Sequence, residues 1–335
     1  MILDVDNLKI QYRTRAGAVH AVDGASFVVP EGRIVGLVGE SGCGKTTAVR
    51  AIMGVLAENG YRAGGRLVFK GQEIDEAATR KLRWRDIAYV PQSAMSSLDP
   101  VYTVGAQIVE VLVKRGKYAA KAARSRSAEL FELVGLSERR LGDYPHQFSG
   151  GMRQRAAIAM ALALEPSLLL ADEPVTALDV IVQRQILDTL RALQQRLGLS
   201  IVLVTHDISV VAYLCDEVVV MYAGQVVERG PVREVLARPR HPYTMGLRNA
   251  FPDLMSDAMA LVPIHGSPPD LAAPPPGCRF APRCPFAEAA CRTEFALPSG
   301  KDHFSACRRD AEADQLRTAA LDPVTWQRSL SYAAS

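Results

Sequence analysis

The sequence predicts an α/β fold followed by a small proline- and cysteine-rich module at its C-terminal end. Apolar, strand-like runs alternate with helical segments through the first 250 residues, which is the pattern of an α/β domain. The composition then changes, because residues 251–335 hold 11 of the 20 prolines and four of the six cysteines. Such proline density disfavours long helices and central strands. A length of 335 residues suits one large and one small domain, so we predict domains at 1–250 and 251–335.

Short apolar runs are the predicted strands of a parallel sheet that is buried on both faces. They span residues 34–38, 167–172, 200–205 and 217–222. A helix is predicted over 183–195 from the three- and four-residue spacing of Ile186, Leu187, Leu190 and Leu193. Residues 91–163 are rich in helix formers and poor in strand signals, so we expect a helical subdomain inserted into the sheet domain. The proline-rich stretch 267–276 is predicted to be an extended connector.

Composition and charge exclude several classes of protein. Apolar residues make up 48% of the chain and charged residues 22%, a balance that can bury a core. The net charge is only +3 and aromatics are 6%, so nucleic acid is not expected as the main partner. The longest apolar run, 156–164, is far shorter than the roughly 20 residues that span a bilayer. The acidic start, residues 1–6, does not resemble a signal peptide, so a soluble cytoplasmic protein is predicted.

Residues 39–46 read Gly-Glu-Ser-Gly-Cys-Gly-Lys-Thr and fit the P-loop pattern G-x-x-x-x-G-K-[ST] at every position. The segment follows a predicted strand and opens a helix, so backbone N–H groups and the helix N-terminus can face phosphate oxygens. Lys45 is expected to reach the β- and γ-phosphates of a nucleotide, and the Thr46 hydroxyl to bind Mg²⁺. The alternative is a glycine-rich turn without a ligand. The predicted nucleotide-binding residues here are Gly39, Ser41, Gly42, Cys43, Gly44, Lys45, Thr46 and Thr47.

A second acidic element follows on another predicted strand. The apolar run 168–171 ends in Asp172 and Glu173. A P-loop enzyme needs such a pair: Asp172 would hold Mg²⁺ through its water shell, and Glu173 would polarise the attacking water. Taken alone, a strand that ends in two carboxylates is often only a solvated strand end. Its place downstream of the P-loop favours the catalytic interpretation.

Three further features follow the P-loop along the chain. Gln92 lies after the apolar run 87–90, Ser-Gly-Gly at 149–151 opens an alanine-rich helix, and His206 follows the strand at 200–205. A side chain at the C-terminal end of a parallel strand reaches the ligand crevice of such a sheet. Each feature alone has a plainer explanation as a surface glutamine, a helix cap or a buried histidine. Their order, together with the Asp-Glu pair and Leu-Asp at 178–179, is more informative than any one of them.

This order of motifs closely resembles the ATPase subunit of ABC transporters, and the resemblance covers residues 1 to about 250. In the signature stretch 148–152, Phe148 and Met152 replace the commonest residues. The resemblance implies a P-loop NTPase fold of the ABC cassette type, with a mixed sheet core and an inserted helical subdomain. It also implies an active hydrolase with ATP as its nucleotide and Mg²⁺ as its metal ion.

The same resemblance assigns roles to individual residues. It implies that Gln92 touches Mg²⁺ and relays to the membrane subunits, and that His206 contacts the γ-phosphate. With Glu173, these are the expected catalytic residues. Tyr12 resembles the aromatic residue that stacks on adenine. Further nucleotide contacts are implied for the signature residues Ser149, Gly150 and Gly151, which would reach a nucleotide held by a partner cassette, and for Asp179.

Two stretches near the C-terminal end narrow the resemblance to one branch of the family. Residues 240–244 and 276–285 look like the C-terminal extension of oligopeptide, dipeptide and nickel importer ATPases, and 96–100 also looks like this branch. The implied partners are a second homologous ATPase subunit, preferably in a heterodimer, two integral membrane permease subunits and an extracytoplasmic substrate-binding protein. The implied location is the cytoplasmic face of the inner membrane. Import of nickel or another small solute, a non-transport ABC ATPase and a non-hydrolysing regulatory protein remain the alternatives.

Four cysteines of the C-terminal module are predicted to bind a metal centre, namely Cys278, Cys284, Cys291 and Cys307. A small module poor in apolar residues usually needs a covalent or metal link. Disulfides are unfavourable in a reducing cytoplasm, and the spacing C-x₅-C-x₆-C-x₁₅-C is wider than in most structural zinc sites. Four loosely spaced thiolates suit a [4Fe–4S] cluster, and the resemblance agrees. Zinc and four unligated thiols are the alternatives.

Overall fold

The structure is a computed structural model, and it describes residues 1–92, 97–250, 263–296 and 299–327. Its larger sheet has the strand order β11-β10-β9-β3-β8-β7-β6. The strands are β3 (Ile34–Val38), β6 (Ile87–Val90), β7 (Leu168–Asp172), β8 (Ser200–Thr205), β9 (Glu217–Tyr222), β10 (Gln225–Pro231) and β11 (Phe304–Ser305). The pairs from β9 to β6 are parallel, whereas β10 and β11 add antiparallel pairs. The predicted buried parallel strands and the mixed character of the sheet are confirmed.

A second, antiparallel sheet was not predicted from the sequence. Its order is β2-β1-β4-β5, and its strands are β1 (Leu3–Thr14), β2 (Gly17–Val29), β4 (Gly60–Phe69) and β5 (Gln72–Glu73). Strand β1 does alternate apolar and polar residues, but its register shifts between Val5 and Leu8. Because a shift of one residue moves side chains to the opposite face, this bulge interrupts the period-two signal.

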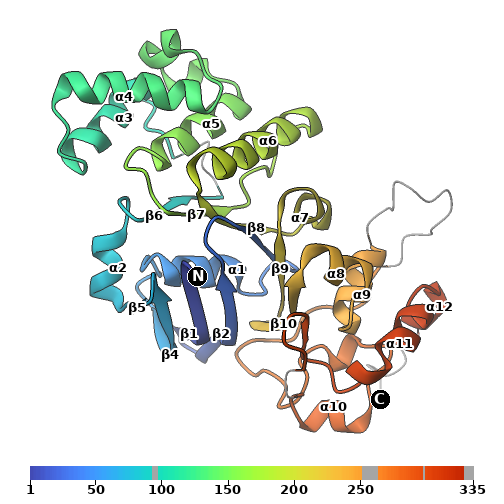
Figure 1. Cartoon of the computed structure of the whole chain (residues 1–335). Helices are drawn as coiled ribbons and strands as arrows, with labels where there is room; N and C mark the ends of the chain where they lie inside the picture. The colour runs from blue at the N-terminus through green and yellow to red at the C-terminus, as the bar shows by residue number, and fades with distance from the viewer. Residues whose placement is uncertain (93–96, 251–262, 297–298, 328–335) are drawn as a thin grey trace.

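Helices surround the larger sheet. They are α1 (Lys45–Ile52), α2 (Glu76–Leu82), α3 (Val104–Lys114), α4 (Ala120–Leu133), α5 (Gly150–Ala161), α6 (Val180–Leu197), α7 (Ile208–Leu214), α8 (Val232–Ala237), α9 (Pro242–Asn249), α10 (Ala289–Thr293), α11 (Ala313–Ala319) and α12 (Pro323–Gln327). Short 3₁₀ helices lie at Glu138–Gly142, Pro145–Gln147, Ala281–Arg283 and Asp310–Glu312. Figure 1 shows α3, α4 and α5, inserted between β6 and β7, grouped at one end of the molecule. This is the helical insertion that the fold class predicted.

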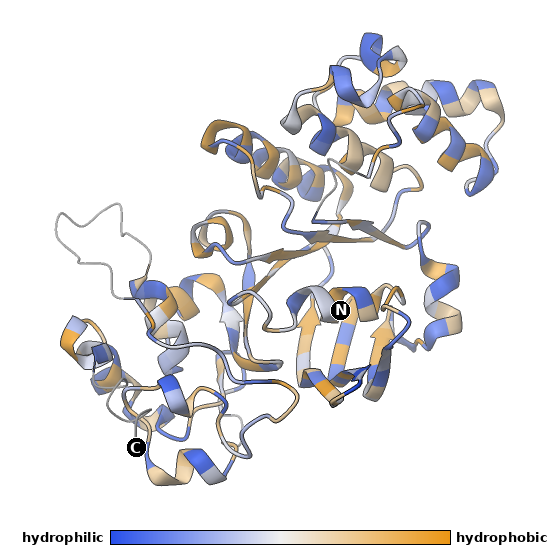
Figure 2. Cartoon of the chain, turned by 180° about the vertical axis from the view of Figure 1, so that it is seen from behind, coloured by the Kyte–Doolittle hydropathy of each residue, from blue (hydrophilic) through white to orange (hydrophobic). Residues whose placement is uncertain are grey.

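Two apolar cores cover the two faces of the larger sheet, whose strands are mostly hydrophobic in Figure 2. On one face, Val35 and Leu37 of β3 pack with α1 and the antiparallel sheet. On the other, Ile34 and Val38 belong to a core shared with the inserted helices and with α6 and α7. The sheet is thus covered on both sides, and the C-terminal ends of its strands are where a ligand binds in sheets of this kind.

The C-terminal segment packs onto this second core. Phe280, Leu316 and Trp326 are buried in the same apolar cluster as the helices that cover the sheet. Strand β11 pairs with β10 through Ser305 and Phe304, which extends the larger sheet. The segment therefore takes much of its stability from contacts with the rest of the chain.

Candidate active site

Three neighbouring strands bring Gln92, Glu173 and His206 together. Gln92 follows β6, Glu173 follows β7 and His206 follows β8, and these strands are adjacent in the sheet. Gln92 Nε2 donates to Glu173 Oε2 over 2.7 Å, and His206 Nδ1 lies 3.2 Å from Glu173 Oε1. The geometry therefore places Gln92 and His206 at the two oxygens of the Glu173 carboxylate, which brings the three residues expected to be catalytic together.

Glu173 is held in a strained backbone conformation. Its φ of 47° lies in the left-handed region, which costs a residue with a side chain about 1–3 kcal/mol. The strain is held by a backbone hydrogen bond from Glu173 N to Val204 O at 2.9 Å. Burial alone would raise the pKa of the carboxyl, but hydrogen bonds from His206, Gln92 and Thr176 outweigh it and lower the pKa. Glu173 is accordingly an oriented, ionised carboxylate at neutral pH.

Asp172 lies at the buried end of β7, beside the P-loop. Its side chain is fully buried and accepts hydrogen bonds from Thr46 Oγ1 at 3.0 Å and from the Tyr89 hydroxyl at 3.1 Å. Burial raises the pKa of Asp172. Burial, together with the nearby Asp172 carboxylate, also raises the pKa of Tyr89 to about 12. A hydroxyl and a carboxylate oxygen in contact are the hard oxygen donors that Mg²⁺ takes from a protein. The residues present fit the ion.

The P-loop has the curled backbone that its glycines were expected to permit. Gly39 has a φ of 157° and Gly44, the cap of α1, has a φ of 100°. A Cβ at these positions would lie 2.1 Å from Met221 O and 2.3 Å from Ala21 O. Only glycine avoids these backbone collisions. Between them, Ser41 and Gly42 are exposed, while Cys43 is buried and its pKa is raised by that burial.

Lys45 carries a buried charge without a carboxylate partner. It is 5% exposed, and its Nζ donates to Gly39 O at 2.7 Å, to Glu40 O at 2.8 Å and to Cys43 Sγ at 3.6 Å. Over the described ranges of the chain, no ion pair includes Lys45. A buried ammonium that only neutral atoms contact is poorly compensated, so an anion such as a nucleotide phosphate fits this place.

The remaining predicted nucleotide-binding residues divide into two groups. Tyr12 lies next to α1, where its hydroxyl is 3.4 Å from Thr47 Oγ1. Ser149 and Asp179 instead begin helices: Ser149 Oγ accepts from Met152 N at 3.4 Å to cap α5, and Asp179 accepts from Val182 N at 2.9 Å to cap α6. In the structure, Ser149 and Asp179 are therefore the N-cap residues of α5 and α6, and Gly150 and Gly151 are the first two residues of α5.

Two contacts of the site were missed by sequence reasoning. The Tyr89 hydroxyl donates to Asp172 Oδ2 at 3.1 Å, and Thr176 Oγ1 donates to Glu173 Oε2 at 3.1 Å. Tyr89 lies in the same short apolar run that precedes Gln92. A strand there, next to β7, could have indicated that the Tyr89 hydroxyl lies near Asp172. Thr176 follows Glu173 by three residues, a spacing at which a turn can return a hydroxyl to the carboxylate.

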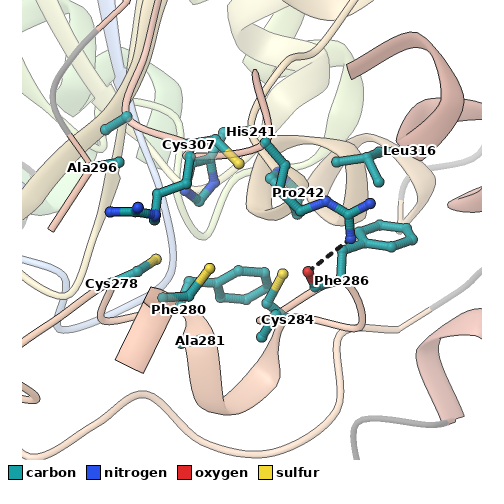
Figure 3. A pocket seen from close by; sticks show the side chains of 15 residues that line it. His241, Pro242, Cys278, Phe280, Ala281, Cys284, Phe286, Ala296, Cys307 and Leu316 are labelled. Atoms are coloured by element: carbon teal, nitrogen blue, oxygen red, sulfur yellow. Dashed lines mark hydrogen bonds between the residues drawn. The ribbon is translucent and has the colours of Figure 1, made fainter. Parts of the chain in front are cut away.

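The four cysteines of the C-terminal segment line one cavity with His241 and Phe280 among its other walls. Figure 3 shows the sulfur atoms of Cys278, Cys284 and Cys307 pointing toward the same space. Burial raises the pKa of each of these three thiols, that of Cys307 to about 12. Within the part of the chain that the structure describes, no three His, Cys, Asp or Glu residues form a group that could hold a metal ion.

Two family models match the chain: ABC transporter over residues 22–176, and oligopeptide/dipeptide transporter, C-terminal region, over residues 227–291. A solved dimeric ATP-binding cassette in a post-hydrolysis state with ADP and Pi is 28% identical, with a TM-score of 0.62, over 69% of this chain and 99% of that one. A part of an ABC transporter complex of Clostridium perfringens is 30% identical, also with a TM-score of 0.62, over 70% of this chain and 90% of that one. Fold and site together define an ABC-type ATPase cassette.

Relatives that match along most of their length show the family to which the chain belongs. The dipeptide transport ATP-binding protein of Bacillus subtilis is 45% identical over 296 residues, 87% of this chain and 88% of that protein. The dipeptide transport ATP-binding protein of Lactococcus lactis subsp. cremoris is 46% identical over 294 residues, 86% of this chain and 84% of that protein. The chain belongs to the ATP-hydrolysing subunits of ABC transporters, as the order of its motifs suggested. Across the described residues, no helix combines the length and hydropathy needed to cross a membrane.

Proposed function

We propose that this chain hydrolyses ATP to power the import of dipeptides or oligopeptides through a membrane transporter. The match of residues 227–291 to an oligopeptide/dipeptide transporter region carries the choice of cargo, because a cassette alone is common to ABC ATPases of many kinds. The names of both relatives, at 45% and 46% identity, support the same choice.

Hydrolysis is proposed to depend on Glu173 as the base that orients water. The carboxylate is ionised and fixed by Gln92, Thr176 and His206, so it can hold a water molecule in line with the γ-phosphate and accept its proton. His206 is more than half exposed beside it, which leaves the imidazole free to contact that phosphate.

Binding of ATP is proposed to use the P-loop and the residues next to it. Lys45 would exchange its two carbonyl partners for the β- and γ-phosphates, and Tyr12 would stack on adenine beside α1. Thr46 and Asp172, with Gln92, would hold Mg²⁺, which when bound neutralises charge on the phosphates. In this proposal the protein residues keep the phosphates fixed while Glu173 acts on the water.

A second cassette is proposed to complete the site. Figure 1 shows α5, which Ser149 caps, among the inserted helices and away from α1. Ser149 is exposed and Gly150 is partly exposed, whereas Gly151 is buried, so a partner's nucleotide would first meet Ser149 and Gly150. Directly after Asp179, Val180 and Ile181 are 79% and 72% exposed, and exposed large apolar side chains of this kind are typical of an interface. A homologous but distinct partner, giving a heterodimer, is the arrangement that we propose.

The transporter is proposed to contain two permease subunits in the membrane and a substrate-binding protein outside it, with this chain on the cytoplasmic face. Val101 and Tyr102 are 72% and 58% exposed at the entry to the inserted helices and are candidate permease contacts. The nearby stretch 96–100, which resembled the peptide branch, lies partly outside the described residues. The cassette is proposed to span 1–250, with the helical subdomain at about 91–163 and the C-terminal extension at 251–335.

Transport itself gives the direct test of the cargo. The complete transporter that contains this chain is expected to take up a radiolabelled dipeptide in an ATP-dependent way, in cells that lack other peptide importers. Unlabelled dipeptides and oligopeptides should compete with the label, and Ni²⁺ should not. Uptake of radioactive nickel without uptake of peptide would contradict the proposed cargo and favour the alternative metal importer.

A [4Fe–4S] cluster is proposed for the cavity of the four cysteines. Such a cluster binds each thiolate to a different iron, so its four sulfurs need not converge on one point. A zinc site needs its donors around a single ion at about 2.3 Å, and the thiols do not form such a group in the described chain. The donor set thus fits the cluster better than zinc, and the cluster would tie together a segment that has little core of its own.

Replacing Cys284 with serine is expected to remove the cluster. Full-length protein purified without oxygen should be brown and contain about four irons per chain, whereas Cys284→Ser should be colourless and nearly free of iron. The matched control is Cys215→Ala, a buried thiol outside the cavity, which should keep its iron. Wild-type protein that is colourless, with zinc or with no metal, would contradict the cluster and leave the ATPase assignment unaffected.

A further inference from the structure

An ion pair joins the C-terminal segment to the P-loop. Arg283 Nη1 donates to Glu40 Oε2 over 2.8 Å, although 243 positions separate the two residues in the chain. Glu40 is the second residue of the P-loop, and Arg283 directly precedes Cys284. Arg283 is only 6% exposed, so the contact is made in a largely desolvated place, where a charge pair is stronger than at the surface.

The Arg283 guanidinium is fixed by its other contacts. Its Nε donates to His265 O at 2.9 Å and its Nη2 to Ile264 O at 3.3 Å, while Nη1 also reaches the Tyr222 hydroxyl at 3.2 Å. A planar guanidinium held on several sides presents one defined direction to its partner. The Glu40 carboxylate therefore faces a cation that has little freedom to move.

Glu40 is in turn the residue that supports Lys45. Its backbone N donates to the Tyr243 hydroxyl at 2.9 Å, and its carbonyl accepts from Lys45 Nζ at 2.8 Å. Tyr243 is fully buried, and its ring lies 5.4 Å from that of Phe280 in the C-terminal segment. A displacement of Glu40 would move the carbonyl oxygen that accepts the hydrogen bond from Lys45 Nζ, and so would disturb the phosphate site.

Charge gives a second reason for the contact. Glu40 places a carboxylate in a loop that receives a triphosphate, and without a counter-ion this carboxylate would repel the ligand. We propose that Arg283 is a positioning residue for ATP, which neutralises Glu40 and holds the P-loop in its binding shape. The inference rests on the proposed role of the P-loop as the phosphate site, and it makes the C-terminal segment a support of that site.

Removal of Arg283 is expected to weaken ATP binding more than catalysis. In Arg283→Ala, the Kd of the full-length protein for ATP and the KM of the assembled transporter should rise about tenfold, with kcat within about twofold of wild type. Arg283→Lys keeps the charge and should recover part of the affinity. The matched control Arg317→Ala removes an arginine that joins the same segment to Pro239 O but does not touch the P-loop, and its Kd should stay at the wild-type value.

A double-mutant cycle with Glu40→Gln tests whether the effect passes through Glu40. In the Glu40→Gln background, removal of Arg283 should change the Kd for ATP by less than about twofold. A wild-type Kd in Arg283→Ala, or an equal loss in both backgrounds, would overturn the proposal. If Arg283→Ala does not fold, Arg283→Gln replaces it in both backgrounds, and the same two outcomes would overturn the proposal. Normal ATP binding by Lys45→Ala would instead contradict the P-loop assignment itself.

Discussion

Replacing Glu173 with glutamine is expected to lower the kcat for ATP hydrolysis by about 10²–10⁴-fold, the usual contribution of a general base. The amide has nearly the same shape but cannot accept a proton from water. It can still contact Gln92, Thr176 and His206, so the fold and the ATP site should persist. ATP should therefore stay bound unhydrolysed and stabilise the dimer of cassettes, which single-turnover kinetics and size-exclusion chromatography with MgATP would measure.

Glu165→Gln is the matched control for this experiment. Glu165 lies shortly before β7 and also has a left-handed backbone, with a φ of 53°, but its carboxylate pairs with Arg126 outside the site. Its kcat should equal that of the wild type. Wild-type hydrolysis by Glu173→Gln would show that another residue activates the water.

Replacing Lys45 with alanine is expected to abolish measurable ATP binding at ordinary nucleotide concentrations. Loss of two charge-assisted hydrogen bonds to phosphate is worth about 3 kcal/mol, or roughly a hundredfold in Kd. The free energy of unfolding without nucleotide should change by less than about 1 kcal/mol, because the lost hydrogen bonds to Gly39 O and Glu40 O are offset by removal of a poorly compensated buried charge. Calorimetric titration with MgATP and urea unfolding measure the two quantities.

A surface lysine provides the comparison. Lys70 is half exposed and pairs with Asp86, so Lys70→Ala should bind ATP as the wild type does. An unchanged ATP affinity in Lys45→Ala would contradict the assignment of the phosphate site.

The parallel part of the fold was predictable because its strands are short, continuous apolar runs. Strand β3 and strand β8 coincide with the predicted ranges 34–38 and 200–205. The antiparallel sheet was not predicted, because the pairing of β1 with β2 shifts register near Leu8 and the alternation on which such a prediction depends is broken. The local hydrophobic pattern therefore predicted the buried parallel strands better than the partly exposed antiparallel sheet.

The candidate site was predictable where its residues follow parallel strands. Since Gln92, Glu173 and His206 each follow a strand of one sheet, their meeting at one edge follows from topology. The pair of Arg283 and Glu40 left no such signal, because nothing in either local sequence indicates a partner 243 positions away. Contacts between remote segments come from tertiary packing, and the periodicity of a single sequence does not indicate which remote residues will meet.

The short pairing of β11 with β10 also bears on how the protein avoids self-association. A free edge of a large sheet offers unpaired N–H and C=O groups to any neighbouring chain. Ser305 and Phe304 occupy part of that edge on β10, and His303 Nε2 lies 2.7 Å from the fully buried Glu228 carboxylate. A chain that lacked this strand would expose a pairing edge, and Glu228 would keep only the hydrogen bonds from Arg240 N and His241 N. Strand β11 thus covers part of the edge at which β10 could otherwise pair with another chain.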